Sequence, residues 1–262
     1  MTTEKTLAIV LRVVEFSETS CVVTLFTEGF GKIGALAKGA RRPKGPFDSA
    51  LDLLAVCRIV FIDKSADALD LLTEARLERR FRSASCDLSR LYAGYYIAEL
   101  LQELTDLGDP HPELYRRADQ ALLALDRDGP VAQTVLGFEV AALRLLGYLP
   151  ALEDCVVCGT PVGGGGRVLF GQLAGGVLCP RCRQGQKQVV SISPRGLAVL
   201  RQLADPSVVG TSGAIDPRVR GELRGLLNHY LANLLGHPSR VLPFLGFLVS
   251  PSTEPFVGQG SP

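Results

Sequence analysis

The chain has 262 residues, of which 47% are hydrophobic and 21% are charged, so it has room for two or three domains with cores of their own. No apolar run is long enough to span a bilayer, and the N-terminal sequence MTTEKTLAIV lacks the basic and apolar regions of a signal peptide, so we expect a cytoplasmic protein with no membrane contact. The net charge of +1 is unevenly distributed. Residues 1–86 hold 13 Lys/Arg against 11 Asp/Glu (+2), residues 87–154 hold 5 against 12 (−7) and residues 155–262 hold 10 against 4 (+6). This asymmetry indicates distinct binding faces for distinct partners.

Residues 6–73 have the pattern of short β-strands separated by polar turns. The runs are rich in Val, Ile and Leu, and Glu28-Gly29 is typical of a turn between two of them. We expect five strands, at Leu7–Val14, Cys21–Thr27, Lys32–Ala40, Val56–Ile62 and Leu69–Thr73. Five short strands within about 75 residues predict a small closed barrel of the oligonucleotide-binding type.

The third of these strands belongs to a concentrated basic stretch, Gly29–Phe47, which contains no acidic residue. Its cations are Lys32, Lys38, Arg41, Arg42 and Lys44. Because side chains alternate along a strand, Lys32 and Lys38 should project from the same face. Small residues around them leave room for a phosphate backbone, although a solvated basic face with no ligand is the alternative interpretation.

Residues 87–147 change to helical periodicity. Ser85 or Asp87 can cap a first helix that ends by Gly108, and two further helices are expected at Glu113–Leu125 and Val131–Leu146. Three tyrosines in the first helix are interpreted as packed residues and not as a base-stacking platform; they are Tyr92, Tyr95 and Tyr96. Further along, helices are expected from Pro194 to about Leu203 and from the Asp216-Pro217 pair to Leu235, followed by a mobile tail at 251–262.

Two CxxC pairs give the strongest chemical pattern in the sequence. They are Cys155, Cys158, Cys179 and Cys182, with a glycine-rich segment between the pairs that suits a hairpin. Four thiolates at this spacing can close a tetrahedral Zn²⁺ site that has no open position, so we expect a structural metal. Paired disulfides, unrelated thiols or an iron–sulfur cluster are the alternatives.

Patterns typical of enzymes are not supported. The sequence Gly29-Phe-Gly-Lys-Ile-Gly34 matches GxGxxG, but neither a helix nor a parallel α/β pattern follows it, so a dinucleotide site is rejected. The three histidines have no nearby Ser or Cys that suggests a triad, and no repeated acidic motif is available for two metal ions. We therefore expect a protein that is not an enzyme.

Taken together and in order, these segments resemble the RecO family of bacterial recombination mediators over nearly the whole chain. The segments that carry the resemblance are VVTLFTEGFGKIGALAKGARRPKG, LYAGYYIAELLQELT, GFEVAALRLLGYLP, the two CxxC pairs with GGVLC, and LRGLLNHYLANLLGHPSR. The resemblance implies an α+β protein in which an N-terminal five-stranded oligonucleotide-binding barrel precedes a helical domain with an embedded four-cysteine zinc module. We expect the domains at 1–80 and 81–250, with the zinc module at 151–190.

The resemblance also implies a function in DNA repair. Proteins of this family bind single- and double-stranded DNA, anneal complementary strands and, with RecR, help RecA to displace single-strand-binding protein. By the same resemblance, the basic run Lys32, Lys38, Arg41, Arg42 and Lys44 matches the family's DNA-binding run on the barrel, and the four cysteines match its zinc ligands. The family also binds the acidic tail of single-strand-binding protein on its helical domain.

The charge of the helical segment bears on the position of this tail site. The helical segment 87–154 is net acidic, so we consider that basic residues of the rear half complete the tail site, namely Arg195, Arg201, Arg218, Arg220 and Arg224. An RNA-binding protein of translation or ribosome assembly is the first alternative function, and a zinc-dependent nuclease or other hydrolase is the second.

Overall fold

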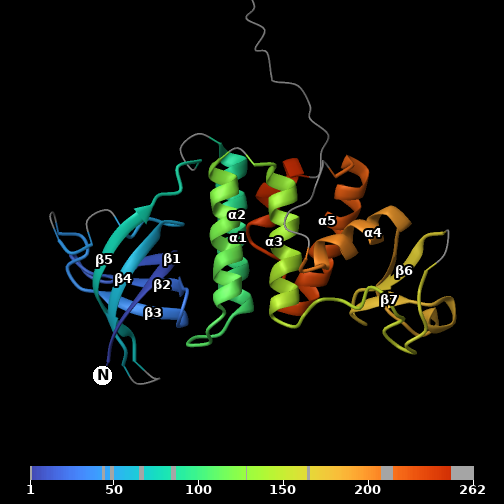
Figure 1. Cartoon of the computed structure of the whole chain (residues 1–262), viewed down its shortest axis with the longest axis horizontal. Coiled ribbons are helices and arrows are strands. Elements are labelled where there is room, and N and C mark those ends of the chain that lie inside the picture. The colour runs from blue at the N-terminus through green and yellow to red at the C-terminus, as the bar shows by residue number, and fades with distance from the viewer. Residues whose placement is uncertain are drawn as a thin grey trace, which may run out of the picture.

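The computed structural model describes residues 2–42, 45–47, 50–64, 68–83, 87–127, 129–163, 166–207 and 215–248. A β-barrel lies at one end of an elongated molecule, a layer of helices occupies the middle, and a small β-rich module lies at the other end (Figure 1). The segments expected to form the mobile tail at 251–262 and part of the loop before the last long helix lie outside the described residues. None of the described helices is both long and apolar enough to cross a membrane.

The five-stranded barrel expected from the sequence is confirmed. Its strands are β1 (Thr3–Glu15), β2 (Cys21–Thr27), β3 (Gly31–Ala37), β4 (Val56–Ile62) and β5 (Asp70–Arg79). They close in the order β1-β2-β3-β5-β4, with β3 parallel to β5 and all other pairs antiparallel. The third strand ends three residues earlier than predicted, because the chain turns at Gly39, whose φ of 72° few side-chain-bearing residues adopt.

The interior of the barrel is filled by every second residue of its strands. On β3, Ile33, Ala35 and Ala37 are buried, whereas the intervening residues are partly exposed. Phe47, from the loop after β3, is only 3% exposed and belongs to the same core. The period-2 pattern therefore sets which side chains of the basic stretch can face solvent.

The helical part contains α1 (Leu88–Leu104), α2 (Pro112–Asp126), α3 (Val131–Leu145), α4 (Pro194–Ala204), α5 (Pro217–Leu235) and the 3-10 helix η3 (Leu242–Leu248). Helix boundaries follow from local chemistry. Asp87 caps α1 and Asp216 caps α5, each accepting hydrogen bonds from two backbone N–H groups, and Gly236 ends α5 with a φ of 78°. These caps match the sequence expectation, whereas η3 was not predicted.

The tyrosines of α1 are packed, as expected. Tyr96 is fully buried, and Tyr92 stacks on Phe244 of η3 with ring centroids 5.1 Å apart. Tyr95 is partly buried against the same helical core. These rings therefore stabilise the helical layer.

The barrel and the helices share a closely packed boundary. The α1–α2 loop pairs with β3, where the N–H of Gly108 donates to the carbonyl oxygen of Lys32 at 2.9 Å. A Cβ on Gly31 would lie 2.1 Å from the carbonyl oxygen of Asp109, so only glycine allows this approach. Arg79 of β5 forms an ion pair with Asp119 of α2 across the same boundary.

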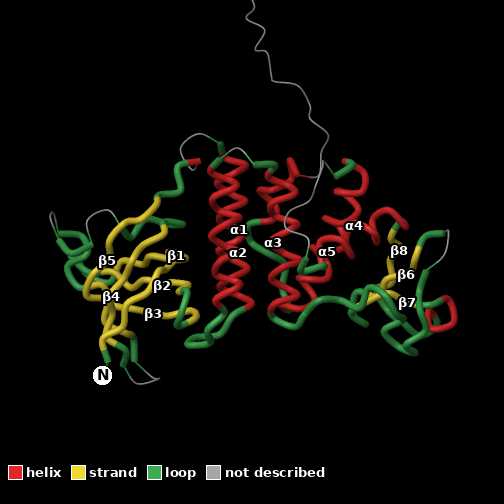
Figure 2. The backbone as a smooth tube through the Cα atoms, viewed as in Figure 1, coloured by secondary structure: helices red, strands yellow, loops and turns green. Residues whose placement is uncertain are grey.

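The third part of the chain is inserted between α3 and α4. It contains β6 (Val168–Gly171), β7 (Gly176–Leu178), the 3-10 turn η2 (Pro180–Arg183) and β8 (Val189–Ile192), with the sheet order β7-β6-β8. Loops make up much of the rest of this inserted part (Figure 2). The hairpin expected between the two CxxC pairs is thus β6–β7, and β8 adds a third strand.

Candidate metal centre and nucleic-acid interface

The four cysteines of the CxxC pairs meet in one cluster. The Sγ atoms of Cys155, Cys158, Cys179 and Cys182 all lie within 4.8 Å of one another, and those of Cys158 and Cys179 are 3.7 Å apart. Four sulfurs placed about 2.3 Å from a central ion would be separated by about 3.8 Å. The cluster therefore has the size and donor set of a tetrahedral thiolate metal site, and zinc fits these donors best.

Two short turns hold the sulfurs in place. In the first, the N–H of Gly159 donates to the carbonyl oxygen of Cys155 at 2.8 Å, and Gly159 has a φ of 68°. In the second, the N–H of Cys182 donates to the carbonyl oxygen of Cys179 at 3.1 Å within η2. The hairpin between the turns brings the two CxxC pairs, twenty residues apart in sequence, to one point.

The electrostatics of the cluster favour a bound cation. Burial raises the pKa of Cys155, but hydrogen bonds from the backbone N–H groups of Cys179, Cys158 and Val157 outweigh it and lower the pKa to about 6. The pKa of Cys182 is raised to about 12, because its thiol hydrogen-bonds with the sulfurs of Cys158 and Cys179. Four thiolates at this separation repel one another unless a cation neutralises them, and a metal ion deprotonates such thiols outright.

The remaining described cysteines are isolated. Cys21 and Cys57 are buried in the barrel core, and burial raises the pKa of both thiols. Each packs as a small apolar residue, as their strand positions predict. Cys86 lies outside the described residues.

Three cations of the basic stretch lie together on the loop that leaves β3. Lys38, Arg41 and Arg42 are exposed, and we call these three residues the barrel patch. The N–H of Arg41 donates to the carbonyl oxygen of Thr19, which ties this loop to the β1–β2 turn. Lys44 lies outside the described residues.

Only one residue of the barrel patch has an ion-pair partner in the described part of the chain. Arg41 Nη1 lies 3.0 Å from Glu15 Oε1, with the two side chains 49% and 76% exposed. Exposed pairs contribute about 0–1 kcal/mol, so a phosphate can replace this carboxylate at small cost.

Lys32 is directed away from the barrel patch. Its Nζ donates to the carbonyl oxygen of Gln102 at 2.5 Å and to that of Thr105, at the C-terminal end of α1. A cation at this position stabilises the carbonyls and the negative end of the helix dipole. Burial lowers the pKa of this amine, while Asp106 and Glu103 oppose that effect. Lys32 thus joins the barrel to α1, whereas Lys38 lies just beyond the end of β3 and is exposed.

The two phenylalanines of the basic stretch pack against the barrel core. Phe47 is a core residue, and Phe30 makes an edge-to-face contact with Phe61 at 5.4 Å between centroids. Phe16, in the β1–β2 turn to which Arg41 is tied, is 66% exposed, so the surface beside the barrel patch offers a ring for base stacking as well as cations for phosphates.

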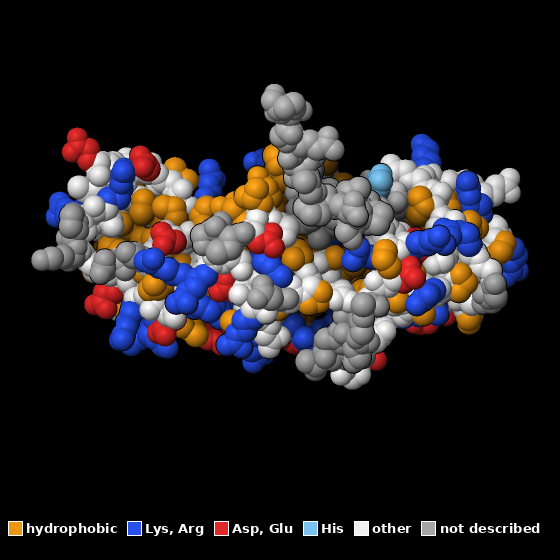
Figure 3. All heavy atoms as spheres, turned by 90° about the horizontal axis from the view of Figure 1, so that it is seen from above, with side chains coloured by type: hydrophobic (Ala, Val, Ile, Leu, Met, Phe, Trp, Pro, Cys, Tyr) orange, Lys and Arg blue, Asp and Glu red, His pale blue; other side chains and the backbone are white. Residues whose placement is uncertain are grey.

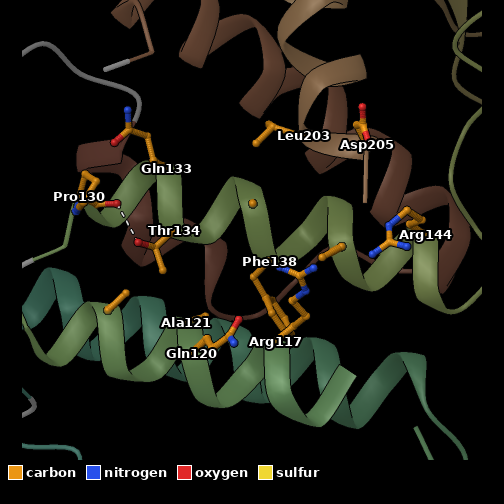
Figure 4. A pocket seen from close by; sticks show the side chains of 13 residues that line it. Arg117, Gln120, Ala121, Pro130, Gln133, Thr134, Phe138, Arg144, Leu203 and Asp205 are labelled. Atoms are coloured by element: carbon orange, nitrogen blue, oxygen red, sulfur yellow. Dashed lines mark hydrogen bonds between the residues drawn. The ribbon is translucent and has the colours of Figure 1, made fainter. Parts of the chain in front are cut away.

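A pocket of about 390 Å³ lies between α2 and α3, at a place that sequence reasoning missed. Two arginines, Arg117 and Arg144, point toward its opening, and Phe138 lies beside them (Figure 4). A Cβ on Gly137 would meet no atom within 4 Å, so the absent side chain of this glycine leaves space in the pocket wall. Asp205 is the acidic residue that lines the pocket in the described part of the chain.

The arginines of α5 do not line this pocket. Arg224 is 3% exposed and forms an ion pair with Glu139 in the helical core, which excludes it from any open binding site. The expectation that Arg224 helps to complete a tail site was therefore wrong. A charged residue on a helix whose neighbours are apolar can be buried when a carboxylate from another helix pairs with it.

Comparisons with known proteins agree with these features. The family model "Recombination protein O N terminal" matches residues 1–81, and "Recombination protein O C terminal" matches residues 86–243. The chain is 46% identical over 263 residues to DNA repair protein RecO of Rhodopirellula baltica, which covers 91% of this chain and 97% of that protein. It is also 34% identical to DNA repair protein RecO of Anaeromyxobacter sp. strain K (92% and 95% covered) and 32% identical to that of Myxococcus xanthus (91% and 95% covered).

Proposed function

The chain belongs to the RecO family of DNA repair proteins, and from this premise we propose that it is a recombination mediator that binds DNA through the barrel patch. It binds single- and double-stranded DNA, anneals complementary strands and, with RecR, assists RecA on DNA coated by single-strand-binding protein. It catalyses no reaction itself and acts in the cytoplasm at the nucleoid. In this proposal residues 1–80 are the DNA-binding domain and residues 81–250 the helical domain, which contains a structural Zn²⁺ module at 151–190.

The observation that carries the proposal is the cluster of exposed cations on the loop after β3. Lys38 and Arg42 form no ion pair in the described part of the chain, and the guanidinium group of Arg41 pairs with an exposed carboxylate. Cations at this position neutralise phosphates and release counterions without reading bases. Annealing follows because neutralised strands repel each other less.

Replacing the barrel patch tests this proposal. The variant Lys38→Ala/Arg41→Ala/Arg42→Ala should bind single-stranded DNA about tenfold or more weakly, and the slope of log K against log[salt] should fall by about 2, since each lost phosphate contact removes about 0.7. Fluorescence anisotropy across a salt series measures both quantities. A control that removes the same charge elsewhere is Arg116→Ala/Arg127→Ala/Arg240→Ala, because all three residues are exposed and lie outside the patch. An unchanged salt slope in the patch variant would exclude the patch as the DNA contact.

RNA binding in translation or ribosome assembly is the alternative function, because phosphates on RNA would meet the same cations. Competition between single-stranded DNA and RNA of equal length separates the two. We expect DNA to compete at least as well as RNA; a clear preference for RNA would favour the alternative.

We further propose that the pocket between α2 and α3 binds the acidic tail of single-strand-binding protein. The segment 87–154 is acidic as a whole, but Arg117 and Arg144 line the pocket itself beside apolar Phe138. The Arg117 and Arg144 side chains are 26% and 22% exposed, and their Nη2 atoms lie 3.9 Å and 3.6 Å from the half-exposed carboxylate of Glu113, so a carboxylate of a bound peptide can replace it. A peptide with carboxylates and an apolar end matches this combination.

Two variants test the tail site by different physical routes. Arg117→Ala/Arg144→Ala removes the charge, and Gly137→Leu fills the space without a clash while improving helix propensity. Each should weaken binding of a synthetic tail peptide by about tenfold or more in calorimetry. Arg116→Ala, next to Arg117 but outside the pocket, is the matched control. Peptide affinity that is unchanged in both variants would contradict this site.

A further inference from the structure

An unusual local charge is carried by the insertion between α3 and α4, which we call the metal-binding module, together with the adjoining helix α4. Residues 155–204 contain six Lys/Arg and no Asp/Glu. Three of the six have partners from outside this segment: Arg167 pairs with Glu222, Arg195 with Asp216 and Arg201 with Glu153. The remaining three are Arg181, Arg183 and Lys187.

These three cations lie on one short turn, residues 180–188, which we call the basic turn. All three are exposed, and none forms an ion pair with another residue that the structure describes. The turn begins inside the second CxxC pair, so Arg181 and Arg183 flank the metal-ligand candidate Cys182.

Hydrogen bonds hold the backbone of the basic turn. The N–H of Gln186 donates to the carbonyl oxygen of Arg183 at 3.2 Å, and the N–H of Gln172 on the adjoining strand loop donates to that of Gln188 at 3.0 Å. Asn233 of α5 donates from Nδ2 to Gln188 Oε1 at 2.8 Å. Arg183 also donates from Nη1 to the carbonyl oxygen of Gln186 at 3.4 Å. These bonds hold the backbone of the turn, so the three cations stay close together.

The composition of the basic turn favours a nucleic-acid backbone over a protein partner. Apart from Pro180 and Cys182 it contains only Arg, Lys, Gln and Gly. Protein interfaces depend on buried aromatic or aliphatic anchors, which this turn lacks, whereas phosphate contacts need cations and hydrogen-bond donors. If Arg181 and Arg183 served only to neutralise the metal site, they would hydrogen-bond to the cysteine sulfurs. Within the described residues, neither arginine does so.

The basic turn lies far from the barrel patch. The metal-binding module and the barrel occupy opposite ends of the molecule, with the helical layer between them (Figure 1). Seen from above, lysine and arginine side chains gather both along the barrel and over the opposite end (Figure 3). One DNA segment bound at the barrel patch would leave the basic turn free for another.

We propose that the basic turn is a second phosphate-binding site, so that one molecule holds two DNA segments, one at each end. The inference rests on the proposed DNA binding at the barrel. It gives annealing a physical basis beyond charge neutralisation, because two segments held on one protein meet at a raised effective concentration. Sequence plays no part in the contact, so any two strands are brought together and only complementary ones then pair.

A capture assay tests the second site. An oligonucleotide fixed on beads binds the protein, and a labelled, non-complementary oligonucleotide is then added. The native chain should capture the label, and Arg181→Gln/Arg183→Gln/Lys187→Gln should capture about tenfold less or worse while still binding the beads. The charge-matched control Arg116→Ala/Arg127→Ala/Arg240→Ala should capture as the native chain does.

The possible outcomes separate the two proposals. Native-level capture by the basic-turn variant overturns the second site, because another surface, a dimer or a protein partner must then hold the second oligonucleotide. This result does not affect the proposed DNA binding at the barrel patch. Native-level binding of the barrel-patch variant to the beads contradicts the barrel site instead. The zinc content of each variant is measured in the same experiment. If the triple variant loses its metal, the single variant Lys187→Gln, whose substitution lies outside the CxxC pair, is used in its place. This variant should reduce capture by about threefold, and native-level capture would reject the second site.

Discussion

Replacing Glu139 by alanine is expected to destabilise the chain by about 3–5 kcal/mol. Glu139 on α3 is fully buried, and its Oε1 accepts hydrogen bonds from the Tyr96 hydroxyl at 2.5 Å and from Arg224 of α5. Arg224 also donates to Asn228 Oδ1 at 2.7 Å. Removing the carboxylate leaves a guanidinium that is 3% exposed without its counter-charge, in a core where few groups can solvate it.

Urea unfolding followed by circular dichroism measures this effect. The double variant Glu139→Leu/Arg224→Met is the informative control, because removing both charges together leaves neither unpaired and should cost much less than Glu139→Ala alone. A loss below about 1 kcal/mol for Glu139→Ala would show that the pair does not stabilise the packing of α1, α3 and α5.

Replacing Cys155 by serine should abolish stoichiometric zinc binding and unfold the two turns that carry the CxxC pairs. Cys155 is 2% exposed and lies in a small cluster with Leu178 and Cys179, so these turns have little apolar core without the metal, whereas the β6–β7 hairpin packs into the helical core through Phe170 and Val177. Structural zinc sites contribute apparent binding free energies of about 10–16 kcal/mol to folding.

Metal content by atomic absorption and hydrogen exchange of the two CxxC turns measure the two effects. Cys21→Ala is the matched control, because that thiol is buried in the barrel and should leave the zinc content unchanged. The barrel should remain folded in the Cys155→Ser chain, since it has a separate core. One zinc per chain in this variant would contradict a four-sulfur site.

Local chemistry made much of the fold predictable. The bounds of β2 and β4 agree with the sequence expectation, because both are short β-branched runs between polar turns. The helix ends at Asp87, Asp216 and Gly236 were also expected, since caps depend on residues within one turn of the helix. The four cysteines could be grouped for a similar reason: metal-ligand spacing is a local constraint on the chain.

Features that depend on distant partners could not be predicted. Lys32 and Lys38 have the same strand parity, but the end of α1 lies beside Lys32 and takes its ammonium group, seventy residues away in sequence. Arg224 is no different in sequence from an exposed helix arginine until Glu139 is placed next to it. Arg117 and Arg144 meet at one pocket only because α2 packs against α3, and this packing cannot be inferred from the sequence. The net negative charge of the segment 87–154 also gave no sign of a basic pocket within it.

The most direct measurement of the central claim is the annealing of complementary strands coated with single-strand-binding protein. The native chain should pair them, and the barrel-patch variant Lys38→Ala/Arg41→Ala/Arg42→Ala should do so about tenfold or more slowly, because fewer phosphates are neutralised at the barrel. The charge-matched control should anneal at the native rate. Equal annealing rates for the native chain and the barrel-patch variant would contradict a DNA-binding function of this surface.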